Sequence, residues 1–278
     1  MNSLITIDDK QLTRKQRQIA DVIQKRGTAV AYMTEQEVAD QARVSIASVS
    51  RFWMMIGFKN FKDYKNEIKK KIEITPENKM KNFVEQIDDG ELFSQLIEQH
   101  FKNLVLTNNH FNNREFNEAI HTIASSSTVF IHAPASSEGL GGLLDFRLKR
   151  FGIHTERMAK SGHEIYESLL HVDSSSAIII FQFVDILPET KVTLEHAREC
   201  NAKTILITDR LVSEMGDAAD FVLYAHRGEM WEFHTMVSPV ALLEALVMGV
   251  GMAMKEESLE KLRVLNEVRK KYRHIVPK

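Results

Sequence analysis

A serine-rich stretch around Arg51 carries the residues whose types and spacing most clearly suggest chemistry. Between Thr34 and Phe58 the chain reads TEQEVADQARVSIASVSRFWMMIGF. Small residues at a helix N-terminus allow close approach to base edges, and an arginine can bind a guanine edge or a phosphate. This pattern predicts a surface that reads double-stranded DNA. The candidate DNA contacts are Thr34, Ser45, Ile46, Ala47, Ser48, Ser50, Arg51, Lys59 and Lys62.

Two short helices must hold these side chains. Thr34 and Glu37 form a capping-box pattern, so the first helix is predicted to begin at Glu35. Ser45 is predicted to be the N-cap of the second helix, with its hydroxyl accepting from the amide of Ser48. Apolar residues in this second helix recur at i, i+3, i+4 and i+7, which predicts one buried face. They are Val49, Phe52, Trp53 and Ile56, and the opposite face has Ile46, Ala47, Ser50, Arg51 and Met54. The alternative is a helical hairpin inside a larger core, because amphipathic helix pairs are common.

The distribution of charge favours DNA over this alternative. Residues 1–75 have 14 Lys and Arg against 9 Asp and Glu, a net charge of +5, whereas the remainder has 22 against 29, or −7. The two sum to the overall −2. A basic first quarter on an acidic body is typical of a protein that is attracted to phosphates at one end.

Composition limits the class of protein. The 278 residues are 44% apolar and 27% charged, which is ordinary for a soluble two-domain chain. No apolar run approaches the ~18 residues of a membrane span, and the N-terminus lacks the apolar core of a signal peptide. Cys200 is the single cysteine, which fits a reducing cytoplasm. No His/Cys cluster has zinc spacing, so we expect neither a metal nor another cofactor.

The pattern of elements changes along the chain. A first helix is predicted to begin after Thr13 and to end at Gly27, and residues 77–113 read as a polar connecting helix broken at Asn112-Asn113. From Thr128, the runs TVFIHA, SAIIIFQF, KTILIT and FVLYA are typical of parallel strands buried on both faces. Alternation of strands with helices implies a doubly wound α/β domain. Further elements are predicted at 114–124, 138–151, 163–170, 189–200, 212–219, 237–254 and 256–271 (helices) and 153–158 (strand), with C-caps at Gly152 and Asn201.

This order of elements resembles the RpiR family of bacterial transcription regulators, which pair a helix-turn-helix domain with a sugar isomerase (SIS) domain. The resemblance rests on MTEQEVADQARVSIASVSRFWMMIGFKNFKDYK, which matches the family's V-S-x-x-S/T-V-x-R-F phrase and its Gly-Phe followed by an aromatic residue. Arg43 departs from it, because a small residue such as Gly is common in that turn. The implied organisation is a helix-turn-helix domain over 1–77, a helical connector over 78–119, a SIS-like domain over 120–260 and a C-terminal helix over 261–278.

The resemblance also implies a ligand site in the SIS-like domain. The loop HAPASSEGLGG keeps the family's Ser pair, although Ala133 and Ala135 replace the usual glycines. The second loop is usually S-x-S-G-x-T-x-E-T and is here QFVDILPET, which lacks both serines and the glycine. The candidate ligand contacts are Ser136, Ser137, His163, Gln182, Asp185, Glu189 and Thr190. Further candidates near this site are Arg157, Lys160, Trp231 and His234.

The altered second loop leaves the ligand class open. Asp185 would face the phosphate of a phosphosugar, and two like charges ~4 Å apart at an effective dielectric of ~20 repel by roughly 4 kcal/mol. This repulsion corresponds to about three orders of magnitude in affinity. The ligand is therefore a sugar phosphate or a different polar metabolite, since Gln182 and Asp185 suit hydroxyl, amide or ammonium groups.

The sequence therefore predicts a cytoplasmic, ligand-responsive regulator, by default a repressor of a catabolic operon. We expect a homodimer or homotetramer on a near-palindromic operator, with no membrane partner. A sugar-phosphate isomerase is the rival class, but no acid/base pair is marked by spacing, and an isomerase has no use for a helix-turn-helix. A nucleoid-type architectural protein would leave the SIS-like domain unexplained.

Overall fold

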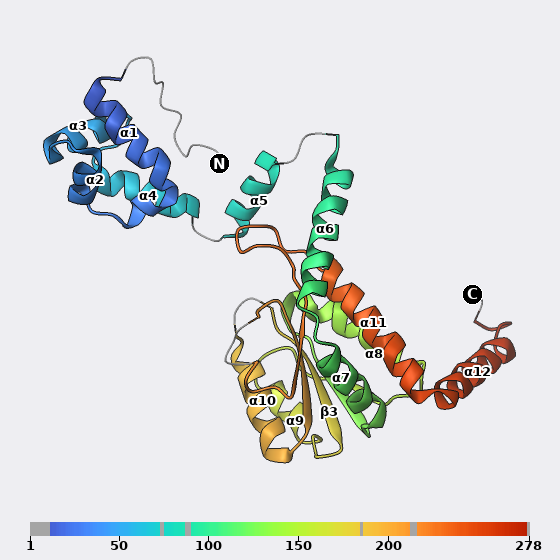
Figure 1. Ribbon diagram of the computed structural model, residues 1–278. Coiled ribbons are helices and arrows are strands. Elements are labelled where there is room, and N and C mark those ends of the chain that lie inside the picture. Colours follow the sequence, from blue (N-terminus) through green and yellow to red (C-terminus); the bar gives the residue numbers. More distant parts are fainter. Residues whose placement is uncertain (1–11, 73–74, 87–89, 184–185, 212–215, 277–278) are drawn as a thin grey trace. The chain divides into compact units, whose positions relative to one another are not determined.

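The computed structural model describes residues 12–72, 75–86, 90–183, 186–211 and 216–276. The chain divides into two compact units (Figure 1). The first unit comprises Met1–Gln86 with Met230–Phe233, and the second comprises Ile87–Glu229 with His234–Lys278.

The first unit is helical. Its elements are α1 (Arg14–Arg26), the 3-10 segment η2 (Gly27–Tyr32), α2 (Glu35–Ala42), α3 (Ile46–Met55), α4 (Phe61–Ile72) and α5 (Pro76–Gln86). Thr13 caps α1 and Gly27 ends it, as predicted. Trp53 is fully buried and stacks on Phe61 and Tyr64, with ring centroids 4.9 and 4.5 Å away. These aromatic contacts fix α3 against α4, since stacked rings add to the burial of apolar area.

The turn between α2 and α3 departs from the prediction at one cap. The Thr34–Glu37 capping box is confirmed, with both reciprocal hydrogen bonds present. Ser45 is the N-cap of α3, as predicted, but the predicted side-chain hydrogen bond is wrong: the Ser45 hydroxyl lies 2.9 Å from the Ser48 hydroxyl, and the Ser48 amide donates to the Ser45 carbonyl. Ser48 thus offers the Ser45 side chain a competing partner. Arg43 has a left-handed conformation (φ 55°, ψ 45°), which explains why glycine is common at this position.

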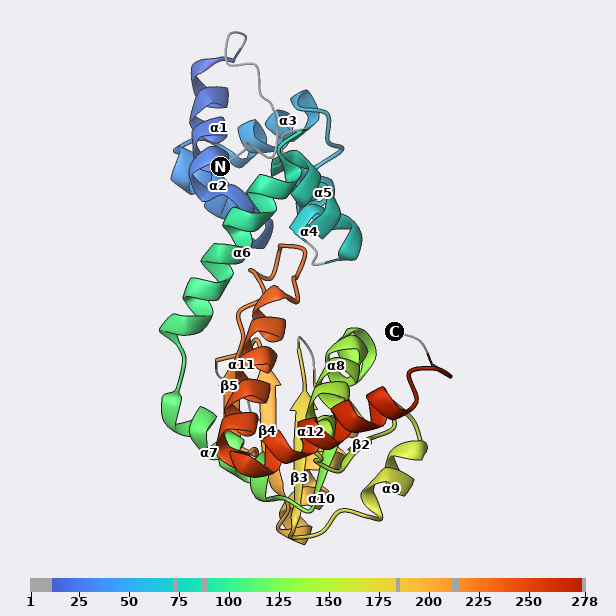
Figure 2. The same cartoon turned by 90° about the vertical axis from the view of Figure 1, so that its right-hand side faces the viewer.

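The second unit contains one five-stranded parallel sheet in the order β2-β1-β3-β4-β5. The strands run side by side in one direction (Figure 2). They are β1 (Thr128–His132), β2 (Thr155–Arg157), β3 (Ser176–Phe181), β4 (Lys203–Thr208) and β5 (Phe221–Tyr224). The predicted doubly wound sheet is therefore confirmed. Its strand order reverses direction between β1 and β3, which makes the carboxyl ends of these two strands a topological switch point.

Helices cover both faces of the sheet because alternate strand residues point in opposite directions. Val129 and Ile179 belong to a core formed with α7 (Asn113–Ser125), α8 (Glu138–Lys149) and α11 (Val237–Met254). Phe130 and Ile178 belong to a second core formed with α9 (Glu164–Leu169) and α10 (Pro188–Cys200). Figure 1 shows these two sets of helices on opposite sides of the sheet. The unit also has α6 (Leu92–Asn109) and α12 (Glu256–Lys271).

Several predicted elements have different bounds. The stretch predicted as one connecting helix forms two, α5 and α6, and Asn112 caps α7 instead of ending α6. Of the helix predicted over 212–219, residues 212–215 lie outside the described residues, and 216–219 form turns and a bend. Asn201 is the left-handed C-cap of α10, as predicted. The predicted C-cap at Gly152 is wrong, because α8 already ends at Lys149 and has Arg150 as its C-cap.

The helix α11 corrects the expectation that no apolar run is long enough to span a membrane. It has 18 residues with a mean hydropathy of 1.8, which suits a membrane span by length and composition. Leu243, Leu246 and Val250 of α11 are fully buried in the core of the second unit. This packing accounts for the part of the apolar surface of α11 that faces the core, and 39% of the helix is buried.

Candidate functional site

The helix α3 has one buried face and one exposed face. Val49, Phe52 and Trp53 are fully buried, whereas Ile46 and Met54 are 46% and 57% exposed. Ala47 and Arg51 are exposed on the same outer face. Exposed apolar side chains on a helix beside an arginine suit the major groove, where thymine methyl groups accept apolar contacts.

The hydrogen bonds of the candidate DNA contacts divide them into two groups. Ser50 donates to the Glu35 carboxylate of α2 at 2.8 Å, and the Thr34 hydroxyl is engaged in the capping box. These two side chains hold the helices in place. The Arg51 Nε donates to the Ala47 carbonyl at 3.1 Å, which uses one of the five donors of the guanidinium.

The basic residues after α3 are placed by α4. Lys59 and Lys62 are exposed, and the Lys59 amide donates to the Asp63 carboxylate, which ties the Lys59 backbone to the first turn of α4. Lys65 instead donates to the Met33 carbonyl at 3.1 Å. Lys59 and Lys62 are therefore available for phosphates, whereas Lys65 connects α4 to the end of η2.

In the second unit, the candidate ligand residues gather at the switch point. Ser136 and Ser137 follow β1 in the 3-10 turn η3 (Ala135–Ser137), whereas Gln182, Glu189 and Thr190 follow β3. The two strands are hydrogen-bonded neighbours, so their carboxyl ends meet at one edge of the sheet. In open parallel sheets this is where ligands bind.

The loop after β1 is tight. Ala135 has φ 50°, a conformation that costs an alanine about 1–2 kcal/mol and a glycine little. A Cβ atom at Gly141 would lie 2.6 Å from the Ala133 Cβ, so α8 approaches the strand closely. Ser137, the last residue of η3, is 3% exposed and directly precedes Glu138, the first residue of α8.

Three buried polar side chains form a chain of hydrogen bonds across the switch point. The Thr190 hydroxyl donates to Oε1 of Gln182 at 2.6 Å and lies 3.3 Å from Nε2 of His132. Because the hydroxyl has one hydrogen, it accepts from His132, whose Nε2 carries the proton. Burial lowers the pKa of His132, while the Ala159 backbone and the Glu189 carboxylate act in the opposite direction. The donor capacity of Thr190 is therefore used inside the protein.

Charged residues surround this chain. Glu138, the first residue of α8, pairs with Lys160 and Arg157, and these cations hold its pKa below the usual value, Lys160 most strongly. Glu189 accepts from the Gly162 amide at 3.0 Å, which lowers its pKa. Arg157 and Lys160 thus have a carboxylate partner in place of a ligand.

The structure brings together Gln182, Glu189 and Thr190, and places Ser136 and Ser137 at the neighbouring strand end. His163 is exposed at the start of α9, next to Gly162 and so near Glu189. Asp185 lies outside the described residues. Sequence reasoning missed His132, because the buried end of a strand reads as core until the partner across the sheet is known. No group of three or more His, Cys, Asp or Glu in the described ranges could hold a metal ion.

Both units match known families. The family described as "Helix-turn-helix domain, rpiR family" matches residues 1–74, and the family described as "SIS domain" matches residues 118–249. A relative from Haemophilus influenzae, described as an "Uncharacterized HTH-type transcriptional regulator", is 26% identical over 218 residues, which are 76% of this chain and 75% of that protein.

Two solved structures share the fold. NanR of Vibrio vulnificus in complex with ManNAc-6P is 16% identical, with a TM-score of 0.58 and coverage of 94% of both chains. The sugar isomerase domain of an RpiR transcription factor from Sphaerobacter thermophilus is 22% identical, with a TM-score of 0.59, and covers 64% of this chain and 99% of that chain.

Proposed function

This chain belongs to the RpiR family of helix-turn-helix proteins with a SIS domain, and we propose that it is a transcriptional regulator whose affinity for DNA is set by a small polar metabolite. The observation that carries the proposal is the outer face of α3. Ile46, Arg51 and Met54 are exposed there, although the helix has a fully buried opposite face. Exposed apolar side chains that gather on one face of a helix mark an interaction site when they form a contiguous patch.

In this proposal α3 lies in the major groove. Ser45, Ala47, Ser48 and Arg51 meet base edges or phosphates, and Lys59 and Lys62 bind the phosphate backbone. Thr34 and Ser50 fix the angle between α2 and α3. Because each neutralised phosphate releases counterions, affinity falls steeply with salt.

The metabolite binds at the carboxyl ends of β1 and β3. Ser136 and Ser137 offer hydroxyl groups, Gln182 and Glu189 offer amide and carboxylate groups, and the N-terminus of α8 attracts an anion. The related NanR structure contains a sugar phosphate. A sugar phosphate is the first candidate here too. A non-phosphorylated metabolite is the alternative, because Thr190 already donates to Gln182 and the family's loop serines are absent.

The regulator acts as a homodimer or homotetramer on a near-palindromic operator in the cytoplasm. Four exposed apolar side chains on α6 recur every four residues and so lie on one side of the helix, which supports a contact between copies. They are Phe93, Ile97, Phe101 and Val105. A metabolite that prefers one arrangement of the copies changes DNA affinity by roughly 5- to 150-fold. By default, we expect the protein to be a repressor that the metabolite releases from its operator.

We propose that the chain is not an enzyme and needs no cofactor. Isomerisation of a sugar phosphate needs an acid and a base facing the substrate. Glu138 is paired with Lys160 and Arg157, and the buried His132 has its Nε2 within 3.3 Å of the Thr190 hydroxyl. Turnover of hexose or pentose phosphates well above background would overturn this part of the proposal.

Footprinting of the intergenic DNA beside this gene tests the regulator proposal. We expect one protected, near-palindromic site and little protection elsewhere. Uniform coverage of the fragment would instead indicate an architectural protein. A parallel thermal-shift series with pairs of sugars and their phosphates separates the two ligand classes, because only the matching class raises the melting temperature of the second unit.

A further inference from the structure

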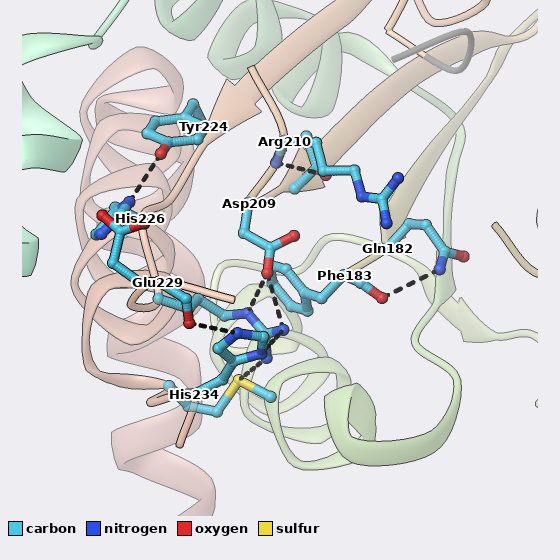
Figure 3. A network of polar contacts seen from close by, with 11 residues as sticks. Gln182, Phe183, Asp209, Arg210, Tyr224, His226, Glu229 and His234 are labelled. Atoms are coloured by element: carbon cyan, nitrogen blue, oxygen red, sulfur yellow. Dashed lines mark hydrogen bonds and ion pairs between the residues drawn. The ribbon is translucent and has the colours of Figure 1, made fainter. Parts of the chain in front are cut away.

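Arg227 is a buried charge that the proposed ligand contacts do not use. It follows β5 and is 3% exposed, and it is the only Arg, Lys, Asp or Glu that is buried among the described residues. Its Nε donates to the Asp209 carboxylate at 2.9 Å, and Nη2 lies 2.9 Å from the same oxygen. Asp209 follows β4, so this ion pair joins the ends of two neighbouring strands (Figure 3). A buried charge persists only when it is paired in this way.

The same guanidinium lies over the ring of Phe183, two residues after the end of β3. The Arg227 Cζ lies 4.2 Å from the centre of the Phe183 ring, which is itself buried. Phe183 directly follows Gln182, one of the candidate ligand contacts. A cation over an aromatic face is attracted most strongly where water is excluded, as it is here. Any movement of Phe183 therefore changes the surroundings of Arg227.

The Arg227 guanidinium also contacts His234, which is hydrogen-bonded to Glu229. Nη2 of Arg227 lies 3.3 Å from Nδ1 of His234, and the Thr235 amide donates to the Arg227 carbonyl at 3.0 Å. Since arginine only donates, Nδ1 of His234 accepts, and its Nε2 donates to the Glu229 carbonyl at 3.2 Å. His234 and Thr235 thus both contact Arg227, the first through its side chain and the second through its carbonyl.

We infer that Arg227 is a positioning residue that makes Gln182 and Phe183, at the end of β3, and the hydrogen-bonded pair of Glu229 and His234 one cooperative unit. The Arg227 guanidinium contacts Phe183, Asp209 and His234, so neither part rearranges alone. A ligand that displaces Gln182 and Phe183 also loosens the pair of Glu229 and His234. This last consequence rests on the proposed function, because it takes Gln182 as a ligand contact, whereas the coupling itself does not.

Amide hydrogen exchange in the full-length, ligand-free protein tests the coupling. Phe183→Leu removes the aromatic face but keeps the Arg227–Asp209 pair. We expect the exchange of the Thr235 amide to accelerate by about fivefold or more relative to the β4 amides, because local opening raises exchange independently of global unfolding. Phe183→Tyr keeps an aromatic face and should retain the slow exchange of Thr235.

The matched control is Phe146→Leu. The Arg150 Cζ lies 5.9 Å from the centre of the Phe146 ring, but Phe146 is exposed on the surface of α8, whereas Phe183 is buried. This variant should leave the exchange of Thr235 unchanged. If Phe183→Leu folds with normal protection of β4 and the Thr235 amide is also unchanged, the coupling is absent and the inference is wrong. DNA affinity of the wild-type protein, measured separately, decides the proposed function independently.

Discussion

The Ser50 hydroxyl of α3 donates to the Glu35 carboxylate of α2 at 2.8 Å and so fixes the two helices of the helix-turn-helix to each other. Ser50→Ala removes this bond without changing the buried face of α3. We expect the unfolding free energy of the first unit to fall by about 1.5 kcal/mol, the lower end of the net contribution of a hydrogen bond to a charged group, because this bond is only partly buried. The rates of hydrogen exchange of the Val49 and Phe52 amides measure this change in unfolding free energy. Unchanged exchange would show that the bond does not stabilise α3.

Arg43 holds a left-handed conformation that a glycine adopts without strain. Arg43→Gly should therefore raise the stability of the first unit by about 0.5–1 kcal/mol, after the greater backbone freedom of glycine in the unfolded chain is counted. Arg43→Ala is the control, because it removes the charge and keeps the Cβ atom. The melting temperature of the first unit should rise for the glycine variant alone. An equal rise for both variants would point to charge instead of backbone strain.

Gly139 and Gly141 are both in α8, but only Gly141 packs against β1. A Cβ atom at Gly141 would lie 2.6 Å from the Ala133 Cβ, whereas one at Gly139 would meet no atom within 4 Å. Gly139→Ala should stabilise the second unit by up to about 1 kcal/mol through helix propensity. Gly141→Ala should destabilise it by about 1–3 kcal/mol through overpacking. Chemical denaturation of the two variants compares them directly, and effects of the same sign would contradict the close approach of α8.

His132 gives the second unit a pH dependence of known sign. Burial lowers its pKa below the usual 6.5, so the unfolded chain binds a proton more readily than the folded one. Stability from this residue is therefore fully present above pH 6.5 and is lost as the pH falls through that value. His132→Gln keeps a donor for Thr190 but does not titrate. The loss of stability between about pH 7.5 and 5 should be smaller in the variant than in the wild type. Equal losses would mean that His132 is not the cause.

Much of the fold could be predicted from local patterns. The apolar runs around Phe130 and Ile178 are long enough to mark strands buried on both faces, and α11 and α12 have the predicted bounds. The capping box at Thr34 was predictable because its two partners are three residues apart. Segments whose turns depend on distant partners were less predictable, as residues 216–219 show.

The candidate site was predicted only in part, for a physical reason. Ser137 and Thr190 belong to recognisable loops, but the partners of Thr190 are set by the register of β1 against β3. His132 and Gln182 lie 50 residues apart in the sequence and meet through Thr190. The contact of Phe183 with Arg227 likewise joins loops after different strands. Sequence spacing does not reveal such contacts.

The effect of Arg51 on operator binding tests the central claim most directly. The probe is the DNA fragment protected in the footprint, titrated by fluorescence anisotropy with the wild-type protein and with Arg51→Ala. Arg269→Ala is the control, since it removes an exposed arginine from α12 in the other unit. We expect Arg51→Ala to weaken binding by about 1–3 kcal/mol, or roughly 5- to 150-fold. Arg269→Ala should bind as the wild type does. An operator affinity unchanged by Arg51→Ala would contradict the assignment of α3 as the recognition helix.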